Sequence, residues 1–172
     1  DAPVLEKSQP TPAISSLVHE GQEIVVQVVK DPIGSKGARL TTQLSIPSRY
    51  LVFLPQSRVL GVSARIEDEA ERTRLKTLMA GLANGSGQGY IVRTNAEAQP
   101  AEALAEDVAY LRRAWDVIKQ AMATTRVGQR VYEDLALPLR AVRDLMRKEV
   151  TAVQVDSREA YERLCGFARQ FM

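Results

Sequence analysis

The stretch Tyr90-Ile91-Val92-Arg93-Thr94, together with the long segment that Pro100 opens, decides the fold. Its first three residues are apolar and follow a glycine run, which predicts a short strand. Pro100 then begins a long helix, because proline is tolerated in a first helical turn. The apolar residues of this helix recur at steps of four and three: Leu104, Val108, Leu111, Trp115, Ile118 and Met122. This spacing puts them in one continuous stripe on one face of the helix.

Upstream of this stretch the pattern indicates strands. Residues 1–16 carry three prolines and no period, which predicts an irregular arm. Residues 23–30 are rich in valine, residues 40–46 alternate apolar and polar, and residues 50–54 are mostly apolar. We expect three strands there. The cluster at 31–37 between the first two contains Gly34 and Gly37 and predicts a turn.

The remaining segments are mostly helical. Residues 67–79 are dense in charge with helical apolar spacing, and residues 136–148 follow the same period. Residues 150–155 alternate weakly and predict a strand. Asp156 is then an expected N-cap, with Glu159 at the reciprocal position of a capping box, and a last helix runs toward Met172. Three strands, helix, strand, two helices, strand and helix form an α+β order without a repeat.

Composition bounds the function classes. The chain has 172 residues, a net charge of +2 and 45% hydrophobic residues, which is typical of a globular protein. A single cysteine and a single histidine leave no internal disulfide and no histidine-rich metal site. We see no apolar run of membrane-spanning length and no signal peptide, and the chain begins with Asp1. These observations predict a cytoplasmic protein, present as a fragment or a processed chain.

Two glycine clusters resemble phosphate loops only superficially. The run at Gly85, Gly87 and Gly89 precedes a strand, whereas phosphate loops follow a strand and open a helix. A mobile turn is the simpler interpretation. The cluster Gly34-Ser35-Lys36-Gly37 lacks the ending of a nucleotide-binding loop, so a hairpin turn is expected. Lys36 at its tip can still contact a phosphate of RNA.

Arg93 and Thr94 are the sharper candidates. A guanidinium fork and a neighbouring hydroxyl can hold one phosphate through charge-assisted hydrogen bonds. From the dipeptide alone, a salt bridge at the end of the strand is the favoured interpretation. Other polar residues have simple structural explanations: a solvated helix face for Arg112, Arg113 and Lys119, a buried core thiol for Cys165, and a surface position for His19. No catalytic triad or metal-spaced carboxylate pair can be assembled.

Several motifs resemble the ribonuclease E/G family. They lie in order along the chain: Glu20-Gly21-Gln22-Glu23 through Asp31-Pro32-Ile33-Gly34-Ser35-Lys36-Gly37-Ala38-Arg39-Leu40-Thr41-Thr42, Ile46-Pro47-Ser48-Arg49-Tyr50-Leu51-Val52-Phe53-Leu54-Pro55, Gly61-Val62-Ser63-Ala64-Arg65-Ile66-Glu67, Ile91-Val92-Arg93-Thr94, and Val155-Asp156-Ser157 with Tyr161-Glu162. The resemblance covers about residues 17–172 and is nearer to the ribonuclease G branch than to the ribonuclease E branch.

The resemblance implies a fold and a domain division. It makes 1–42 the C-terminal part of an S1-like OB domain, a β segment of a barrel. Residues 43–139 correspond to a mixed α/β 5′-sensor domain, and 140–172 to the start of an RNase H-like subdomain. The family's metal-binding aspartates, in a DNase I-like domain, and its zinc-binding cysteines are expected beyond Met172. The chain by itself is therefore expected to be catalytically inactive, with no metal ligand of its own.

The resemblance also implies an activity and a set of site residues. The family cuts single-stranded RNA hydrolytically with Mg²⁺ and prefers a 5′-monophosphate end. In this chain Arg93, Thr94, Val52 and Ser48 match the 5′-phosphate pocket, and Lys36 and Arg65 match RNA-binding positions. Ser48 stands where ribonuclease E has glycine, and Ala64 stands where it has a first arginine before Arg65. A homo-oligomer is implied for the full-length protein, with no membrane partner.

Two other classes of function are compatible with the same residues. One is a stand-alone RNA-binding module without nuclease activity. The other is a scaffold fragment whose open strand edges pair with a second chain. Sequence beyond Met172 would distinguish the first from a nuclease, and the mass in solution would test the second.

Overall fold

The computed structural model describes residues 13–83, 85, 87–146 and 149–172. Residues 1–12 of the expected irregular arm at 1–16 lie outside the described residues. In the remainder, α1 (Ile14–Leu17) is a single short helical turn. The described part is mixed α+β, with a two-stranded and a four-stranded sheet and no closed barrel. In these residues, no helix is both long and apolar enough to cross a membrane.

The four-stranded sheet is the centre of the molecule. Its order is β3 (Ile46–Pro47), β4 (Leu51–Leu54), β6 (Gly89–Val92) and β5 (Leu60–Val62). The pairs β3–β4 and β4–β6 are antiparallel, and β5 runs parallel to β6. Along β4, buried and half-buried residues alternate, because one face of the sheet is covered and the other is not.

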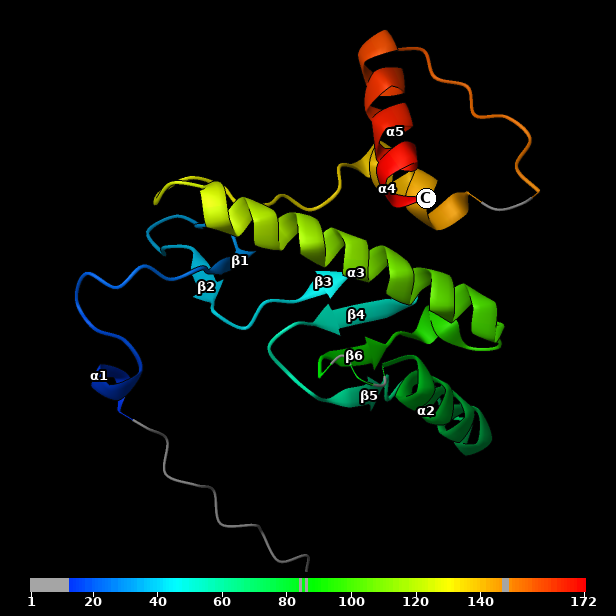
Figure 1. Ribbon diagram of the computed structural model, residues 1–172, viewed down its shortest axis with the longest axis horizontal. Coiled ribbons are helices and arrows are strands. Elements are labelled where there is room, and N and C mark those ends of the chain that lie inside the picture. Colours follow the sequence, from blue (N-terminus) through cyan, green and yellow to red (C-terminus); the bar gives the residue numbers. More distant parts are fainter. Residues whose placement is uncertain (1–12, 84, 86, 147–148) are drawn as a thin grey trace, which may run out of the picture.

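Two helices cover the buried face. Helix α3 (Ala101–Thr124) packs on β4, and α2 (Glu69–Ala83) packs on β5 and β6 (Figure 1). The apolar stripe predicted for α3 faces the sheet, with Leu104 and Leu111 fully buried and Trp115 against Phe53 at 6.1 Å between ring centroids. Removing such apolar area from water is the main source of stability.

One glycine of the predicted loop is required by packing. Gly89 begins β6 at a point where a Cβ atom would lie 2.7 Å from the carbonyl oxygen of Val59. Any larger residue would push the chain before β5 away from β6. Gly85 and Gly87 have positive φ angles, as turn glycines do.

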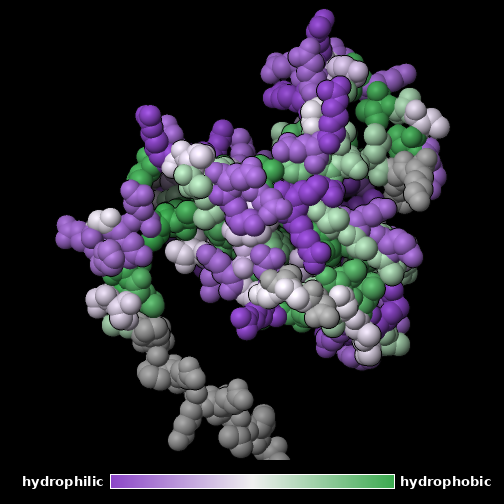
Figure 2. Space-filling model, in the orientation of Figure 1, coloured by the Kyte–Doolittle hydropathy of each residue, from purple (hydrophilic) through white to green (hydrophobic). Residues whose placement is uncertain are grey.

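The two ends of the described chain extend beyond this centre. Strands β1 (Gln27–Lys30) and β2 (Arg39–Thr41) form an antiparallel hairpin, and α4 (Leu137–Leu145) packs on α5 (Arg158–Phe171) (Figure 1). The predicted border at residue 139 falls inside α4. Hydrophobic side chains are exposed over both ends (Figure 2).

Several sequence predictions were wrong in detail. Residues 40–46 do not form one strand: β2 ends at Thr41 and β3 begins at Ile46, in different sheets. Residues 150–155 form no strand, and β5 was not predicted. Ser157, not Asp156, caps α5, because its Oγ accepts the N–H of Ala160 at 3.3 Å.

Two predictions about single residues also need correction. Cys165 is only half-buried and lies against the Tyr161 hydroxyl, so it is not a core thiol. Arg112 and Arg113 are exposed but not merely solvated, since they donate to the carbonyls of Leu82 and Phe171. His19 is exposed, as predicted.

Candidate functional site

The turn between β3 and β4 is held by one buried carboxylate. Asp107 belongs to α3 and is 7% exposed. Its Oδ2 accepts the hydroxyl of Ser48 at 2.5 Å and the main-chain N–H groups of Tyr50 at 2.9 Å and Leu51 at 3.0 Å. Three donors from four consecutive residues thus meet a single oxygen, which fixes the shape of the turn.

Arg93 lies directly beside this turn. It follows β6, and its main-chain N–H donates to the Tyr50 carbonyl at 2.8 Å. Its side chain is half-buried, and Nη1 donates to the Ser48 carbonyl at 2.5 Å, with the Arg49 carbonyl at 3.5 Å. Within the described residues Arg93 forms no ion pair with a carboxylate. The salt bridge considered from sequence is therefore wrong for this part of the chain, and the positive charge of Arg93 has no anionic partner there.

The other three predicted phosphate-site residues lie near Arg93, along the chain or across the sheet. Thr94 begins the short helix η1 (Thr94–Ala96) and is half-buried, and its hydroxyl makes no hydrogen bond to any described residue. Val52 is paired with Ile91, two residues before Arg93 on the neighbouring strand. Ser48 lies in the turn that receives the Arg93 guanidinium. The structure thus brings Arg93, Thr94, Val52 and Ser48 into one small region.

Ser48 contributes to this region as a support. It is fully buried, its hydroxyl is directed to Asp107, and its N–H donates to the Leu51 carbonyl at 2.8 Å. Its carbonyl accepts the Arg93 guanidinium. Each polar group of Ser48 already has a partner in Asp107, Leu51 or Arg93, so Ser48 has no donor left for a ligand. The donors still available in the region belong to Arg93, to Thr94 and to Arg49, whose guanidinium lies over the Tyr50 ring at 4.7 Å.

The two predicted RNA-binding cations lie in different places. Arg65 is exposed in the connection between β5 and α2, where Ser63 donates its N–H to the Val92 carbonyl at 2.9 Å. This bond holds the Arg65 segment next to the end of β6. Lys36 is exposed at the tip of the β1–β2 hairpin, where it exchanges two main-chain hydrogen bonds with Ile33, each 3.1 Å long. The predicted hairpin turn is confirmed.

Two charged residues of the site, one buried and one half-buried, were missed from sequence. Asp107 lies three residues after Leu104 and four before Leu111, on the apolar stripe of α3. A lone acidic residue on such a stripe was the available signal. Arg143 of α4 donates from Nη1 to the Pro47 carbonyl at 3.1 Å and pairs with Asp144 at 2.7 Å. It therefore anchors the other end of the same turn.

Burial governs the electrostatics of this turn. Removal from water raises the pKa of Asp107, while the hydrogen bonds from Ser48 and the turn N–H groups and the charge of Arg143 act in the opposite direction. Burial also raises the pKa of Tyr110 to about 12, and its hydroxyl bonds to Arg143. Asp107, Tyr110 and Arg143 therefore form a connected polar group beneath the turn.

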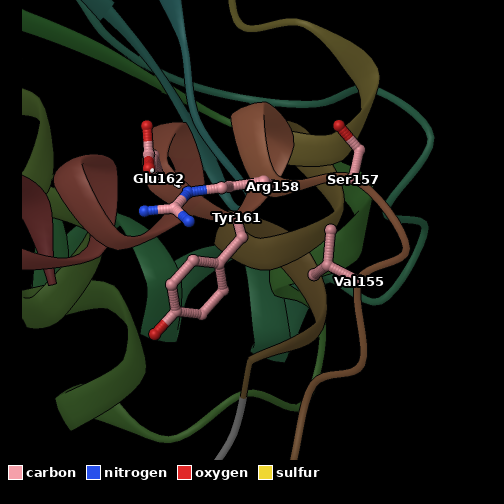
Figure 3. A pocket seen from close by; sticks show the side chains of 5 residues that line it. All are labelled: Val155, Ser157, Arg158, Tyr161 and Glu162. Atoms are coloured by element: carbon pink, nitrogen blue, oxygen red, sulfur yellow. Dashed lines mark hydrogen bonds and ion pairs between the residues drawn. The ribbon is translucent and has the colours of Figure 1, made fainter.

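A shallow hollow elsewhere offers a useful contrast. It lies at the start of α5 and is lined by Val155, Ser157, Arg158, Tyr161 and Glu162 (Figure 3). There Arg158 donates from Nε to Glu162 Oε1 at 3.0 Å, so its charge is already neutralised. Arg93 lacks such a partner, which makes the β3–β4 turn the better candidate for binding an anion.

The residues present give no fit for Mg²⁺. Across the described part of the chain, no three His, Cys, Asp or Glu side chains gather closely enough to hold a metal ion. We therefore assign no metal-dependent step to these residues.

Comparison with known proteins agrees with the motifs. The chain matches the model of the Ribonuclease E/G family over residues 45–172. The chain belongs to the ribonuclease E/G family. It is 46% identical to Ribonuclease G of Salmonella typhimurium (strain SL1344) over 159 residues, which is 92% of this chain and 32% of that protein. Ribonuclease G of Escherichia coli (strain K12) gives the same identity and coverage. Ribonuclease E of Nostoc sp. is 39% identical over 88% of this chain and 22% of its own length.

The matches to this family cover only part of each relative. The chain spans about a third of the length of the curated ribonuclease G proteins that it matches. Within the matched range lie the β3–β4 turn, Arg93 and Asp107, whereas the whole β1–β2 hairpin precedes the range of the family model.

Proposed function

We propose that this chain is the part of an endoribonuclease that binds single-stranded RNA and recognises its 5′-monophosphate end. The observation that carries the proposal is Arg93, a half-buried guanidinium fixed to the Ser48 carbonyl without a carboxylate partner among the described residues. A positive charge that is partly removed from water and has no carboxylate partner costs free energy unless an anion binds to it. Arginine matches phosphate because its planar donors can make two parallel hydrogen bonds.

The charge of a terminal phosphate is the reason to propose an RNA 5′ end, and not an internal phosphodiester, as the ligand of Arg93. A phosphomonoester carries roughly −1.5 to −2 charges at neutral pH, more than an internal phosphodiester. Arg93 supplies the fork and Thr94 a hydroxyl donor. A 5′-hydroxyl end would leave these donors unpaired, and a triphosphate would exceed a small site in size. In this proposal, Val52 and the turn at Ser48 would form the walls of the site.

The rest of the proposed mechanism follows from the family. Arg65, beside the end of β6, and Lys36, at the hairpin tip, would contact phosphates farther along the strand. In this proposal, Mg²⁺-dependent hydrolysis is carried out by residues other than these 172. The full-length protein would be cytoplasmic and would form a homo-oligomer.

Mutation of Arg93 tests the proposal. Arg93→Ala should weaken binding of a 5′-monophosphorylated oligoribonucleotide about tenfold or more, since each charge-assisted hydrogen bond contributes roughly 1.5–3 kcal/mol. It should hardly change binding of the same RNA with a 5′-hydroxyl. Arg93→Lys should restore only part of the affinity, because an ammonium group cannot make the planar fork. Fluorescence anisotropy with both RNAs measures these effects.

A matched control removes an arginine of equal charge. Arg158→Ala breaks the exposed pair with Glu162 and should leave the preference for the 5′ end unchanged. Equal losses for both RNA ends in Arg93→Ala would make Arg93 a structural residue and refute the proposed sensor.

A further inference from the structure

We propose that Asp107 is a positioning residue for the 5′-phosphate site, because its carboxylate holds the two residues that hold Arg93. This inference rests on the function proposed above. Asp107 itself is buried beneath the turn and would not contact RNA.

The first step is the connection from Asp107 to the turn. Its Oδ2 accepts the hydroxyl of Ser48 and the N–H groups of Tyr50 and Leu51 at 2.5–3.0 Å. These bonds are charge-assisted, which makes them short and strong. Without the carboxylate, three buried donors would lose their acceptor, so the turn would have to rearrange.

The second step runs from the turn to Arg93. The Ser48 hydroxyl donates to the Asp107 carboxylate, and the Ser48 carbonyl accepts a hydrogen bond from the Arg93 guanidinium, both at 2.5 Å. Tyr50 gives its N–H to Asp107, and its carbonyl accepts the Arg93 main-chain N–H at 2.8 Å. Arg93 is therefore fixed at both its backbone and its side chain by residues that Asp107 fixes.

The location of Asp107 argues against a role in packing alone. It lies on the apolar stripe of a long helix, between Leu104 and Leu111, where an apolar side chain would avoid the cost of burying a carboxylate. Its bonded partners are confined to one turn, the turn that receives Arg93. A fixed guanidinium loses little freedom when it binds an anion, which favours affinity.

Asp107→Asn is the conservative test. The amide keeps the shape and one acceptor oxygen but removes the charge. We expect about fivefold weaker binding of a 5′-monophosphorylated oligoribonucleotide, the effect of weakening one charge-assisted contact, and less than about twofold for its 5′-hydroxyl form. Asp116→Asn is the matched control, because Asp116 lies on the same helix, is exposed and pairs only with Lys119 among described residues.

A double-mutant cycle separates positioning from general destabilisation. If Asp107 acts through Arg93, Asp107→Asn should cause no further loss in the Arg93→Ala background. The same loss in both backgrounds, or equal losses for both RNA ends, would overturn the inference. If Arg93→Ala itself shows no dependence on the 5′ end, the proposed function fails and this inference falls with it. A selective Arg93→Ala with an unselective Asp107→Asn refutes Asp107 alone.

Ser48→Ala provides a second route should Asp107→Asn not fold. It removes one of the three donors to Asp107 and keeps the carbonyl that receives Arg93. We expect a loss of about two- to threefold, confined to the 5′-monophosphorylated RNA. A thermal melt of each variant confirms that it is folded at the assay temperature. An unchanged preference for the 5′ end in folded Ser48→Ala would then refute the inference.

Discussion

Among the described residues, every acceptor of the Arg93 side chain is a main-chain carbonyl, as is also the case for Arg112 and Arg113. Arg72, Arg74 and Arg158 each meet a glutamate three or four residues away on their own helix. Such pairs satisfy the guanidinium locally and contribute little to stability. The carbonyls of Ser48 and Arg49 orient the Arg93 guanidinium without neutralising it, so its charge remains available to a ligand.

A second residue-scale feature supports the chain just after the site. Glu71 accepts two hydrogen bonds from Arg74, at 2.6 and 2.7 Å, and one from the N–H of Ala98 at 2.9 Å. Ala98 has a φ of 56°, a left-handed conformation that costs energy in a residue with a Cβ atom. The carboxylate therefore holds a strained turn between Thr94 and α3.

This carboxylate predicts a pH-dependent contribution to stability. The hydrogen bond from Arg74 lowers the pKa of Glu71 from 4.5 to about 2. The stabilisation is therefore complete above pH 4.5 and is lost as the pH falls toward 2. Glu71→Gln should lower the Tm at pH 7 by roughly 2–4 °C, corresponding to ~1 kcal/mol for a partly exposed pair. The difference from wild type should shrink below pH 4.5 in thermal melts.

Glu69 is the matched control for this prediction. It lies in the same helical turn, is mostly exposed and pairs with Arg72 at 3.3 Å. Glu69→Gln should change the Tm by less than Glu71→Gln at pH 7. A Glu71 effect that persists undiminished at pH 2 would show that shape, not charge, matters there.

At the scale of elements, periodicity predicted the helices better than the strands. The apolar stripe from Leu104 to Met122 was sufficient to predict α3, because each turn of the helix places an apolar side chain on the same buried face. Alternation at 40–46 was misleading. The side chain of Gln27 bonds to both the N–H and the carbonyl of Ser45, at 2.8 and 3.0 Å, and so replaces a strand partner just before β3. A side chain 18 residues away leaves no trace in the local pattern.

The same limit applied to the site. Family motifs predicted Arg93, Thr94, Val52 and Ser48 as one group, and the structure brings them together. Asp107 and Arg143 were missed because they bind main-chain groups that lie 56 or 57 residues away for Asp107 and 96 residues away for Arg143. Every residue type has the same main-chain N–H and carbonyl groups, so the sequence does not show which of them a side chain will bind. For Asp107, the only signal was an acidic residue on an apolar helix face.

The β1–β2 hairpin carries a prediction for the salt dependence of RNA binding. Lys36 is exposed at its tip, where a single phosphate contact is expected. Each such contact to a single strand changes the slope of log K against log salt by about 0.7. Lys36→Ala should therefore reduce the magnitude of this slope by about 0.7 while keeping the preference for the 5′ end. Titrations at several salt concentrations measure it, and an unchanged slope would exclude Lys36 from the interface.

On the scale of the whole molecule, apolar burial is uneven. The four-stranded sheet contains Leu51 and Phe53 at 0% exposure, whereas Val28, Val29 and Leu40 of the hairpin are each more than half exposed. Figure 2 shows such hydrophobic surface at the hairpin and at the α4–α5 end. Stability depends on buried apolar area, so the sheet and its two helices should be the most stable part of the chain.

Hydrogen exchange tests this distribution directly. A two-stranded hairpin is marginally stable by itself, and this one is tied to the sheet by the Gln27–Ser45 bonds. Amides of β1 and β2 should therefore exchange through local opening, with rates that hardly change at low denaturant concentration. Amides of β4 and β6 should exchange only on global unfolding and respond steeply to denaturant. Gln27→Ala should accelerate exchange in the hairpin and leave β4 and β6 unchanged. Uniform protection across both sheets would instead mean that the hairpin and the centre unfold as one cooperative unit.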